Sequence, residues 1–109
     1  MIKLIVSDID GTLVPEGNTD LNPEYLEVIK KLTEKGIVFA AASGRHASSI
    51  NAVFRPVSER IYYVSDNGAC IEKNGKEERA LYLPAKELRE LLYEARKMEG
   101  CYVMFSAVD

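Results

Sequence analysis

The chain has 109 residues, of which 47% are hydrophobic and 28% charged, a composition typical of one globular domain rather than of a disordered or fibrous protein. Its formal net charge is -3, and acidic and basic residues are interleaved without a basic stripe, which argues against a nucleic-acid partner. The first apolar stretch, at residues 2–6, is interrupted by Lys3 and is too short for a signal peptide or a membrane span. We therefore expect a cytoplasmic protein without a membrane partner.

The two cysteines, Cys70 and Cys101, lie far apart in the sequence and have no CxxC spacing or neighbouring histidine. A disulfide framework or a zinc site needs closer groupings of ligands. The sequence therefore predicts two buried free thiols.

The first half of the chain alternates between strand and helix patterns. Residues 2–7 form an apolar run that ends in polar residues, as a buried parallel strand feeding a loop does. Asn22-Pro23-Glu24 supplies an N-cap, a first-turn proline and a first-turn acid, and helical spacing of apolar residues continues to Gly36. Residues 37–42 predict a second buried strand, and residues 47–54 a shorter helix that ends before Pro56.

The second half predicts a third strand at residues 61–65, followed by a hairpin around Asn74-Gly75. Alternating strands and helices imply right-handed crossovers, so the predicted fold class is α/β with a Rossmann-like parallel sheet. Beyond residue 79 we expect a short strand at 81–83, a helix from Pro84 to Gly100 and a last strand at 101–108. The apolar stripe of that helix should pack on a core; its members are Leu88, Leu91, Leu92 and Ala95.

The strongest chemical signal is the hexapeptide Asp8-Ile9-Asp10-Gly11-Thr12-Leu13 at the end of the first strand, where open α/β sheets place their ligands. Residues two apart in an extended segment project to the same side, so both carboxylates should address one point. One carboxylate can attack while the other transfers a proton. The glycine and the following backbone amides could cradle phosphate oxygens, and Mg²⁺ would offset the repulsion between these acids and a phosphate.

Two shorter patterns follow the second and third strands. Ser43-Gly44-Arg45 places a hydroxyl and a guanidinium beside the first loop, although such a triplet alone is more often a helix N-cap and turn. Asp66-Asn67-Gly68-Ala69 is equally well explained as a turn into the hairpin. His46 is expected to be an ordinary residue at a helix start.

Together these motifs resemble those of the haloacid dehalogenase superfamily of phosphohydrolases, in its Cof-type, sugar-phosphatase-like branch. The resemblance implies that Asp8 is the nucleophile and Asp10 the acid/base, with Mg²⁺ held by the Asp8 carboxylate and the Asp10 main-chain carbonyl. Thr12 would position Asp10, and Ser43 would donate a hydrogen bond to the phosphoryl oxygen. The resemblance makes the remaining phosphate- and substrate-binding candidates Gly11, Thr12, Gly44, Arg45 and Asn67.

The resemblance also implies a longer protein. Residues 1–78 would be the N-terminal part of the catalytic core and residues 79–109 the beginning of an α/β cap domain. The lysine and the acidic residues of the family's third and fourth motifs have no counterpart here, so we expect an incomplete core with impaired hydrolysis of small phosphorylated metabolites. The strand at 2–6 should then present an open apolar edge, which favours homo-oligomers.

Two alternatives remain open. A response-regulator receiver domain is also an α/β protein of about this length, and its phosphorylated aspartate would be Asp66. A receiver, however, keeps its first-strand acids adjacent, whereas Asp8 and Asp10 are separated. The other alternative is a catalytically inactive chain that only binds Mg²⁺, phosphate or another copy of itself.

Overall fold

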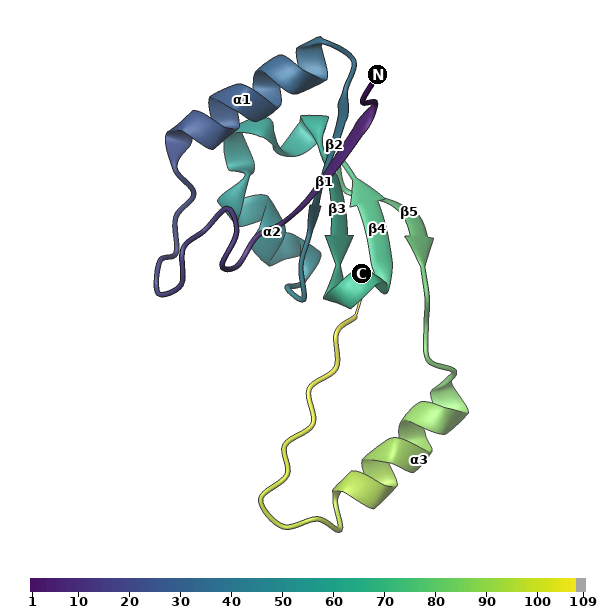
Figure 1. Cartoon of the computed structure of the whole chain (residues 1–109). Helices are drawn as coiled ribbons and strands as arrows, with labels where there is room; N and C mark the ends of the chain where they lie inside the picture. Colours follow the sequence, from purple (N-terminus) through teal and green to yellow (C-terminus); the bar gives the residue numbers. More distant parts are fainter. Residues whose placement is uncertain (108–109) are drawn as a thin grey trace.

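The structure is a computed structural model that describes residues 1–107 and contains one five-stranded sheet in the order β1-β2-β3-β4-β5. β1, β2 and β3 are parallel, and β4 and β5 continue the sheet as an antiparallel hairpin (Figure 1). The predicted α/β class and the hairpin are thus confirmed. In chain order the elements are β1 (Leu4–Asp8), α1 (Pro23–Glu34), β2 (Val38–Ala42), α2 (Ala47–Val53), η1 (Arg55–Arg60), β3 (Tyr62–Ser65), η2 (Asp66–Gly68), β4 (Cys70–Lys73), β5 (Lys76–Ala80) and α3 (Ala85–Ala95).

Local sequence signals account for the ends of these elements. The Asn22 side chain accepts a hydrogen bond from the Glu24 amide at 3.0 Å, which caps α1 as predicted. The hairpin between β4 and β5 turns at Asn74 and Gly75, whose φ angles are 51° and 72°. Two positive φ angles define the turn that matches the twist of paired strands, and Asn-Gly is the pair that adopts it most readily.

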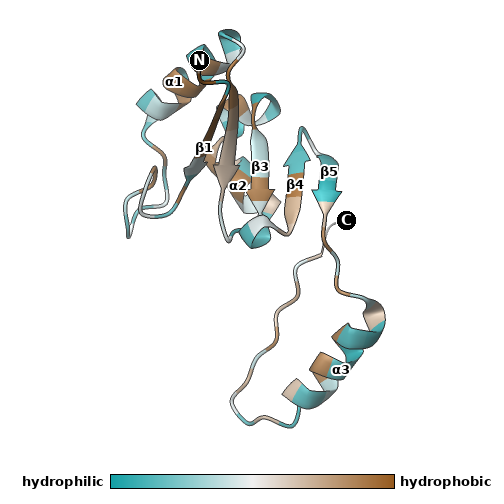
Figure 2. Ribbon diagram, turned by 45° about the vertical axis from the view of Figure 1, so that its right-hand side comes forward, coloured by the Kyte–Doolittle hydropathy of each residue, from teal (hydrophilic) through white to brown (hydrophobic). Residues whose placement is uncertain are grey.

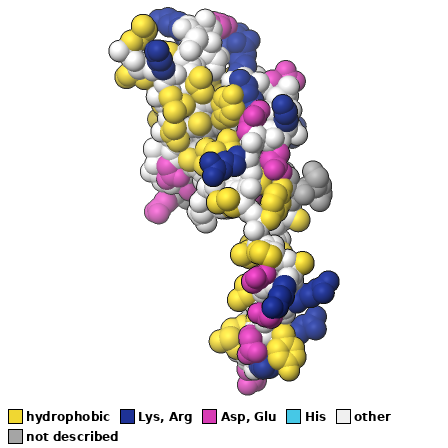
Figure 3. Space-filling view, turned by 90° about the vertical axis from the view of Figure 1, so that its right-hand side faces the viewer, with side chains coloured by type: hydrophobic (Ala, Val, Ile, Leu, Met, Phe, Trp, Pro, Cys, Tyr) yellow, Lys and Arg dark blue, Asp and Glu magenta, His cyan; other side chains and the backbone are white. Residues whose placement is uncertain are grey.

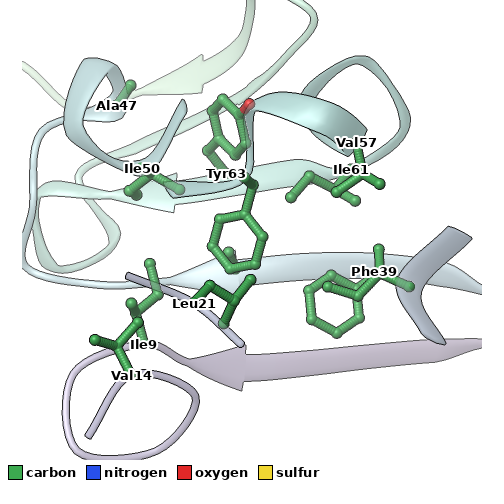
Figure 4. Close-up of a cluster of buried hydrophobic side chains, with 12 residues drawn as sticks. Ile9, Val14, Leu21, Phe39, Ala47, Ile50, Val57, Ile61 and Tyr63 are labelled. Carbon is green, nitrogen blue, oxygen red and sulfur yellow. The ribbon is translucent and has the colours of Figure 1, made fainter. Parts of the chain in front are cut away.

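The hydrophobic core lies between the sheet and α1, α2 and η1, which cover one face of the sheet (Figure 1). Both crossovers run in the same direction along the sheet, so right-handed connections place both helices on the same side. Figure 4 shows side chains from the strands meeting those from the helices. The buried cluster consists of Ile9, Val14, Leu21, Ile29, Phe39, Ala41, Ala47, Ile50, Phe54, Val57, Ile61 and Tyr63.

The opposite face of the sheet is open in the part of the chain that the structure describes. Leu4, Val6 and Val38 point to this face and are 56%, 55% and 41% exposed. Figure 3 shows hydrophobic side chains gathered on the upper body of the molecule, on the side turned toward the viewer. β1 is also an edge strand, paired only with β2 among residues 1–107. The expected apolar edge at the start of the chain is therefore present.

The segment after β5 differs from the prediction. Residues 81–83 form no strand, and neither do residues 101–107, because no neighbouring strand offers them a ladder of hydrogen bonds. Val108, the end of the predicted last strand, lies outside the described residues. α3 forms as predicted but buries none of its residues, so its stripe does not pack on a core. The stripe, visible in Figure 2, comprises Leu88, Leu91, Leu92 and Ala95.

Residues 81–107 extend away from the sheet and make the molecule elongated, with extents of 52 × 31 × 24 Å and a radius of gyration of 16.6 Å. A compact domain of this length would have a radius of gyration of about 13 Å.

Cys70 is buried as predicted, but Cys101 is exposed because it lies in the segment that extends away from the sheet. None of the helices among residues 1–107 is long and apolar enough to cross a membrane.

Candidate active site

The carboxyl ends of the three parallel strands meet at one edge of the sheet. Asp8 ends β1 beside Ala42 of β2, Ser43 follows β2, and Asn67 follows β3. An open cavity of about 330 Å³ lies at this edge. It is lined by Asp8, Ala42, Ser43, Gly44, Val64, Asn67 and Gly68. The structure therefore brings four predicted site residues from three separate motifs around one cavity.

Asp8 is exposed at the cavity, and within residues 1–107 it forms no ion pair. The Thr12 hydroxyl lies 3.5 Å from Asp8 Oδ2, at the outer limit of a hydrogen bond. Thr12 was expected to position Asp10, but its side-chain hydrogen bond is to Asp8. A carboxylate attacks as a nucleophile in its unprotonated form.

Asp10 does not line the cavity with Asp8, contrary to the prediction that both carboxylates address one point. β1 ends at Asp8, and the chain then turns back so that Asp10 and Val14 form an isolated bridge. The two-residue alternation of a strand therefore no longer applies at Asp10. Arg45 instead donates two hydrogen bonds to the Asp10 carboxylate, of 3.0 Å from Nε and 2.6 Å from Nη2.

The Arg45 pair controls the charge of Asp10. Hydrogen bonds and attraction from the guanidinium lower the pKa of Asp10 below its ordinary value, and the same contact raises the pKa of Arg45. Asp10 is therefore held ionised in this arrangement. Arg45 Nη1 also lies 3.5 Å from the hydroxyl of Ser49. The sequence patterns did not indicate Ser49, which lies in the first turn of α2 while Arg45 precedes the N-cap His46.

The backbone amides after Asp10 are already engaged. The Gly11 amide donates to the Val14 carbonyl at 2.8 Å, and the Thr12 amide donates to the Ile9 carbonyl at 3.1 Å. Gly11 has a φ of 77°, so it provides the tight turn that the sequence predicts. In this structure, however, these two amides close the turn and are not free to cradle a phosphate, as had been expected.

Ser43 lies at the cavity beside Asp10, whose pKa its hydroxyl helps to lower. The residue is 9% exposed, and its Oγ accepts a hydrogen bond from the Arg45 amide at 3.1 Å. A hydroxyl that accepts through its oxygen can still donate its own hydrogen.

His46 is the N-cap of α2, where its side chain accepts a hydrogen bond from the Ser48 amide, so the prediction of a helix-start residue is confirmed.

The Asp8 carboxylate is of the oxygen-ligand type that Mg²⁺ takes in proteins. The Asp8 carboxylate carries no ion pair among the described residues, and the Asp10 main-chain carbonyl lies two residues further along the chain. Mg²⁺ is satisfied by one or two carboxylates together with phosphate oxygens and water. No group of three or more His, Cys, Asp or Glu side chains that could hold a metal occurs in residues 1–107.

Comparison with known families identifies the family of the chain. Residues 5–109 match the family described as haloacid dehalogenase-like hydrolase. The chain belongs to this family. The resemblance inferred from the motifs is thereby confirmed, and the response-regulator alternative is set aside.

Individual relatives are consistent with this assignment. The HMP-PP phosphatase of Serratia proteamaculans is 31% identical over 94 residues, which cover 85% of this chain and 34% of that protein. A solved structure from Eubacterium rectale has 33% identity and a TM-score of 0.78, covering 88% of this chain and 37% of that one. A subclass IIB sugar phosphatase of the superfamily has 26% identity and a TM-score of 0.67, with 87% and 37% covered. The chain thus spans about a third of the length of the proteins it resembles.

Proposed function

We propose that this haloacid dehalogenase-like chain carries the nucleophile side of a magnesium-dependent phosphatase site for small phosphorylated metabolites. The observation that carries the proposal is that Asp8, with no ion pair within residues 1–107, lines one cavity with Ser43. Relatives that are an HMP-PP phosphatase and a sugar phosphatase support small phosphate esters as the substrate class.

The proposed reaction has two displacements at phosphorus. A carboxylate oxygen of Asp8 attacks the phosphorus, the bond from phosphorus to the ester oxygen breaks, and the departing oxygen takes a proton from Asp10. Water then attacks the aspartyl phosphate, gives a proton to Asp10, and releases inorganic phosphate as the bond to Asp8 breaks. The Ser43 hydroxyl donates to a phosphoryl oxygen, on which negative charge is concentrated.

Asp10 must change partners during this cycle. A carboxylate has no proton to donate, and here it accepts two hydrogen bonds from Arg45, so before the acid step these bonds have to break and Asp10 has to take up a proton from solvent. Asp10 is largely exposed, which leaves room for that movement. When bound, Mg²⁺ would be held by the Asp8 carboxylate and the Asp10 carbonyl and would offset the repulsion between the carboxylate and the phosphate.

The test is hydrolysis of an aryl phosphate by the 109-residue chain, with and without Mg²⁺, compared between the unmodified chain, Asp8→Asn and Glu27→Gln. Asn keeps the shape of Asp8 but cannot form the acyl phosphate, so turnover should fall by at least about a hundredfold. Glu27 is an exposed acid on α1, outside the cavity lining, and its substitution by Gln removes one negative charge, as Asp8→Asn does. Glu27→Gln should therefore retain the activity of the unmodified chain.

Equal turnover by Asp8→Asn and the unmodified chain would contradict the proposal. Absence of turnover in all three proteins, with Mg²⁺ and phosphate still bound, would favour the inactive binding chain instead.

A further inference from the structure

The loop after β3 has an unusual backbone. Asp66, Asn67 and Gly68 have φ angles of 50°, 55° and 92°, so three consecutive residues are left-handed. Residues with side chains adopt this conformation rarely, and Asn and Asp tolerate it best. A run of such residues persists only where surrounding contacts hold it in place.

Those contacts come from the loop after β2. The Asp66 amide donates to the Arg45 carbonyl at 2.9 Å, and the Asn67 amide donates to the Ser43 carbonyl at 3.1 Å. The Ser43 amide in turn donates to the Val64 carbonyl at 2.9 Å. Two backbone hydrogen bonds thus join the two loops and a third joins the loop after β2 to β3, so the position of Asn67 depends on the Ser43-Gly44-Arg45 loop.

Gly44 makes room for the Asn67 side chain. A Cβ atom placed on Gly44 would come 2.9 Å from Asn67 Oδ1 and 3.4 Å from its Cγ and Nδ2. The first distance is shorter than van der Waals contact allows, so the carboxamide could not stay where it is. Gly44 has no positive φ that would otherwise require glycine. A side chain at position 44 would therefore displace the carboxamide from its present place.

The carboxamide lines the same cavity as Asp8 and Ser43, and Asn67 is solvent-exposed there. We propose that the Asn67 carboxamide, seated against Gly44, donates a hydrogen bond to a phosphoryl oxygen of the substrate beside the Ser43 hydroxyl. This inference rests on the proposed phosphatase function. It makes Asn67 a phosphate-binding residue and Gly44 the residue that positions it.

The test is a double-mutant cycle on the affinity of the 109-residue chain for inorganic phosphate at saturating Mg²⁺. The affinity is measured from the change in NMR chemical shifts as phosphate is added. Asn67→Gly removes the carboxamide, and glycine readily keeps the left-handed backbone. The expected loss is about tenfold in affinity, as for a hydrogen bond to a charged group. Gly44→Ala should cause a similar loss in the unmodified chain and no further loss in the Asn67→Gly background, because the group that the new methyl displaces is then absent.

Asn74→Gly is the matched control, since Asn74 is also left-handed but lies in the hairpin turn away from the cavity. It should bind phosphate as the unmodified chain does. If Asn67→Gly binds phosphate as tightly as the unmodified chain, or if the two losses simply add, the inference is wrong while the proposed function stands. If the unmodified chain binds no phosphate with Mg²⁺, the proposed phosphate site fails and the inference fails with it.

Discussion

At the scale of single residues, the Arg45–Asp10 pair is the main electrostatic feature of the site. Its atoms come from positions 35 residues apart in the sequence, and both hydrogen bonds reach the same carboxylate. A planar guanidinium matches a carboxylate in this two-point geometry, which a lysine could not reproduce. The pair therefore fixes the direction of Asp10 as well as its charge.

Replacing Arg45 by Gln should raise the pKa of Asp10 toward its ordinary value, because the guanidinium is the largest cause of the lowered pKa. The pKa is lowered in the folded state, so the contact adds stability above the unfolded-state pKa, and that stability is lost as the pH falls through the folded-state pKa. The measurement is an NMR titration of the Asp10 carboxyl carbon without metal.

Arg60→Gln is the control for this titration, because Arg60 meets Glu34 at 3.9 Å, away from Asp10. Its substitution should leave the Asp10 titration unchanged. An Asp10 pKa that stays lowered in Arg45→Gln would show that another group, such as Ser43, is responsible.

At the scale of elements, α1 depends on its cap. Asn22 satisfies one of the amides that the first turn of a helix leaves without a partner, and Pro23 follows at the first helical position. α1 in turn contributes Ile29, which is 2% exposed, to the core beneath β1 and β2. Loss of the cap should therefore lower the free energy of unfolding of the whole domain.

Asn22→Ala should lower the free energy of unfolding by about 1 kcal/mol, the usual cost of removing an N-cap side chain. Urea denaturation followed by circular dichroism measures this difference. Asn18→Ala is the matched control, because Asn18 is an exposed loop residue whose backbone amide, not its side chain, donates a hydrogen bond to the Pro15 carbonyl. Equal effects of the two substitutions would contradict the capping role of Asn22.

At the scale of the whole molecule, the chain has one covered and one uncovered sheet face. The uncovered face carries Leu4, Val6 and Val38, and the β1 edge beside it is unpaired within residues 1–107. Beyond Ala80 the chain leaves the sheet, close to the proposed boundary between residues 1–78 and 79–109. An exposed apolar face next to an open strand edge favours association.

We propose that two copies of the 109-residue chain associate through this face and edge. Val6→Lys places a charge at the centre of the contact and should raise the dissociation constant by at least about tenfold. Light scattering during size-exclusion chromatography over a range of concentrations measures the mass. Tyr25→Lys, at an exposed position on α1, should have no effect. A monomeric unmodified chain at high concentration would contradict the proposal.

The sequence by itself determined the elements up to the β4–β5 hairpin and the family to which the chain belongs. Asn22-Pro23 begins α1, Asn74-Gly75 forms the hairpin turn, and the strand that ends in Asp8 identifies the family, because caps, turns and strand patterns act between neighbours in the chain. Only the tertiary structure decided which side chains meet. Asp10 is paired with Arg45, and Asn67 lies against Gly44, since each contact depends on where separate strands end and how the loops beyond them turn.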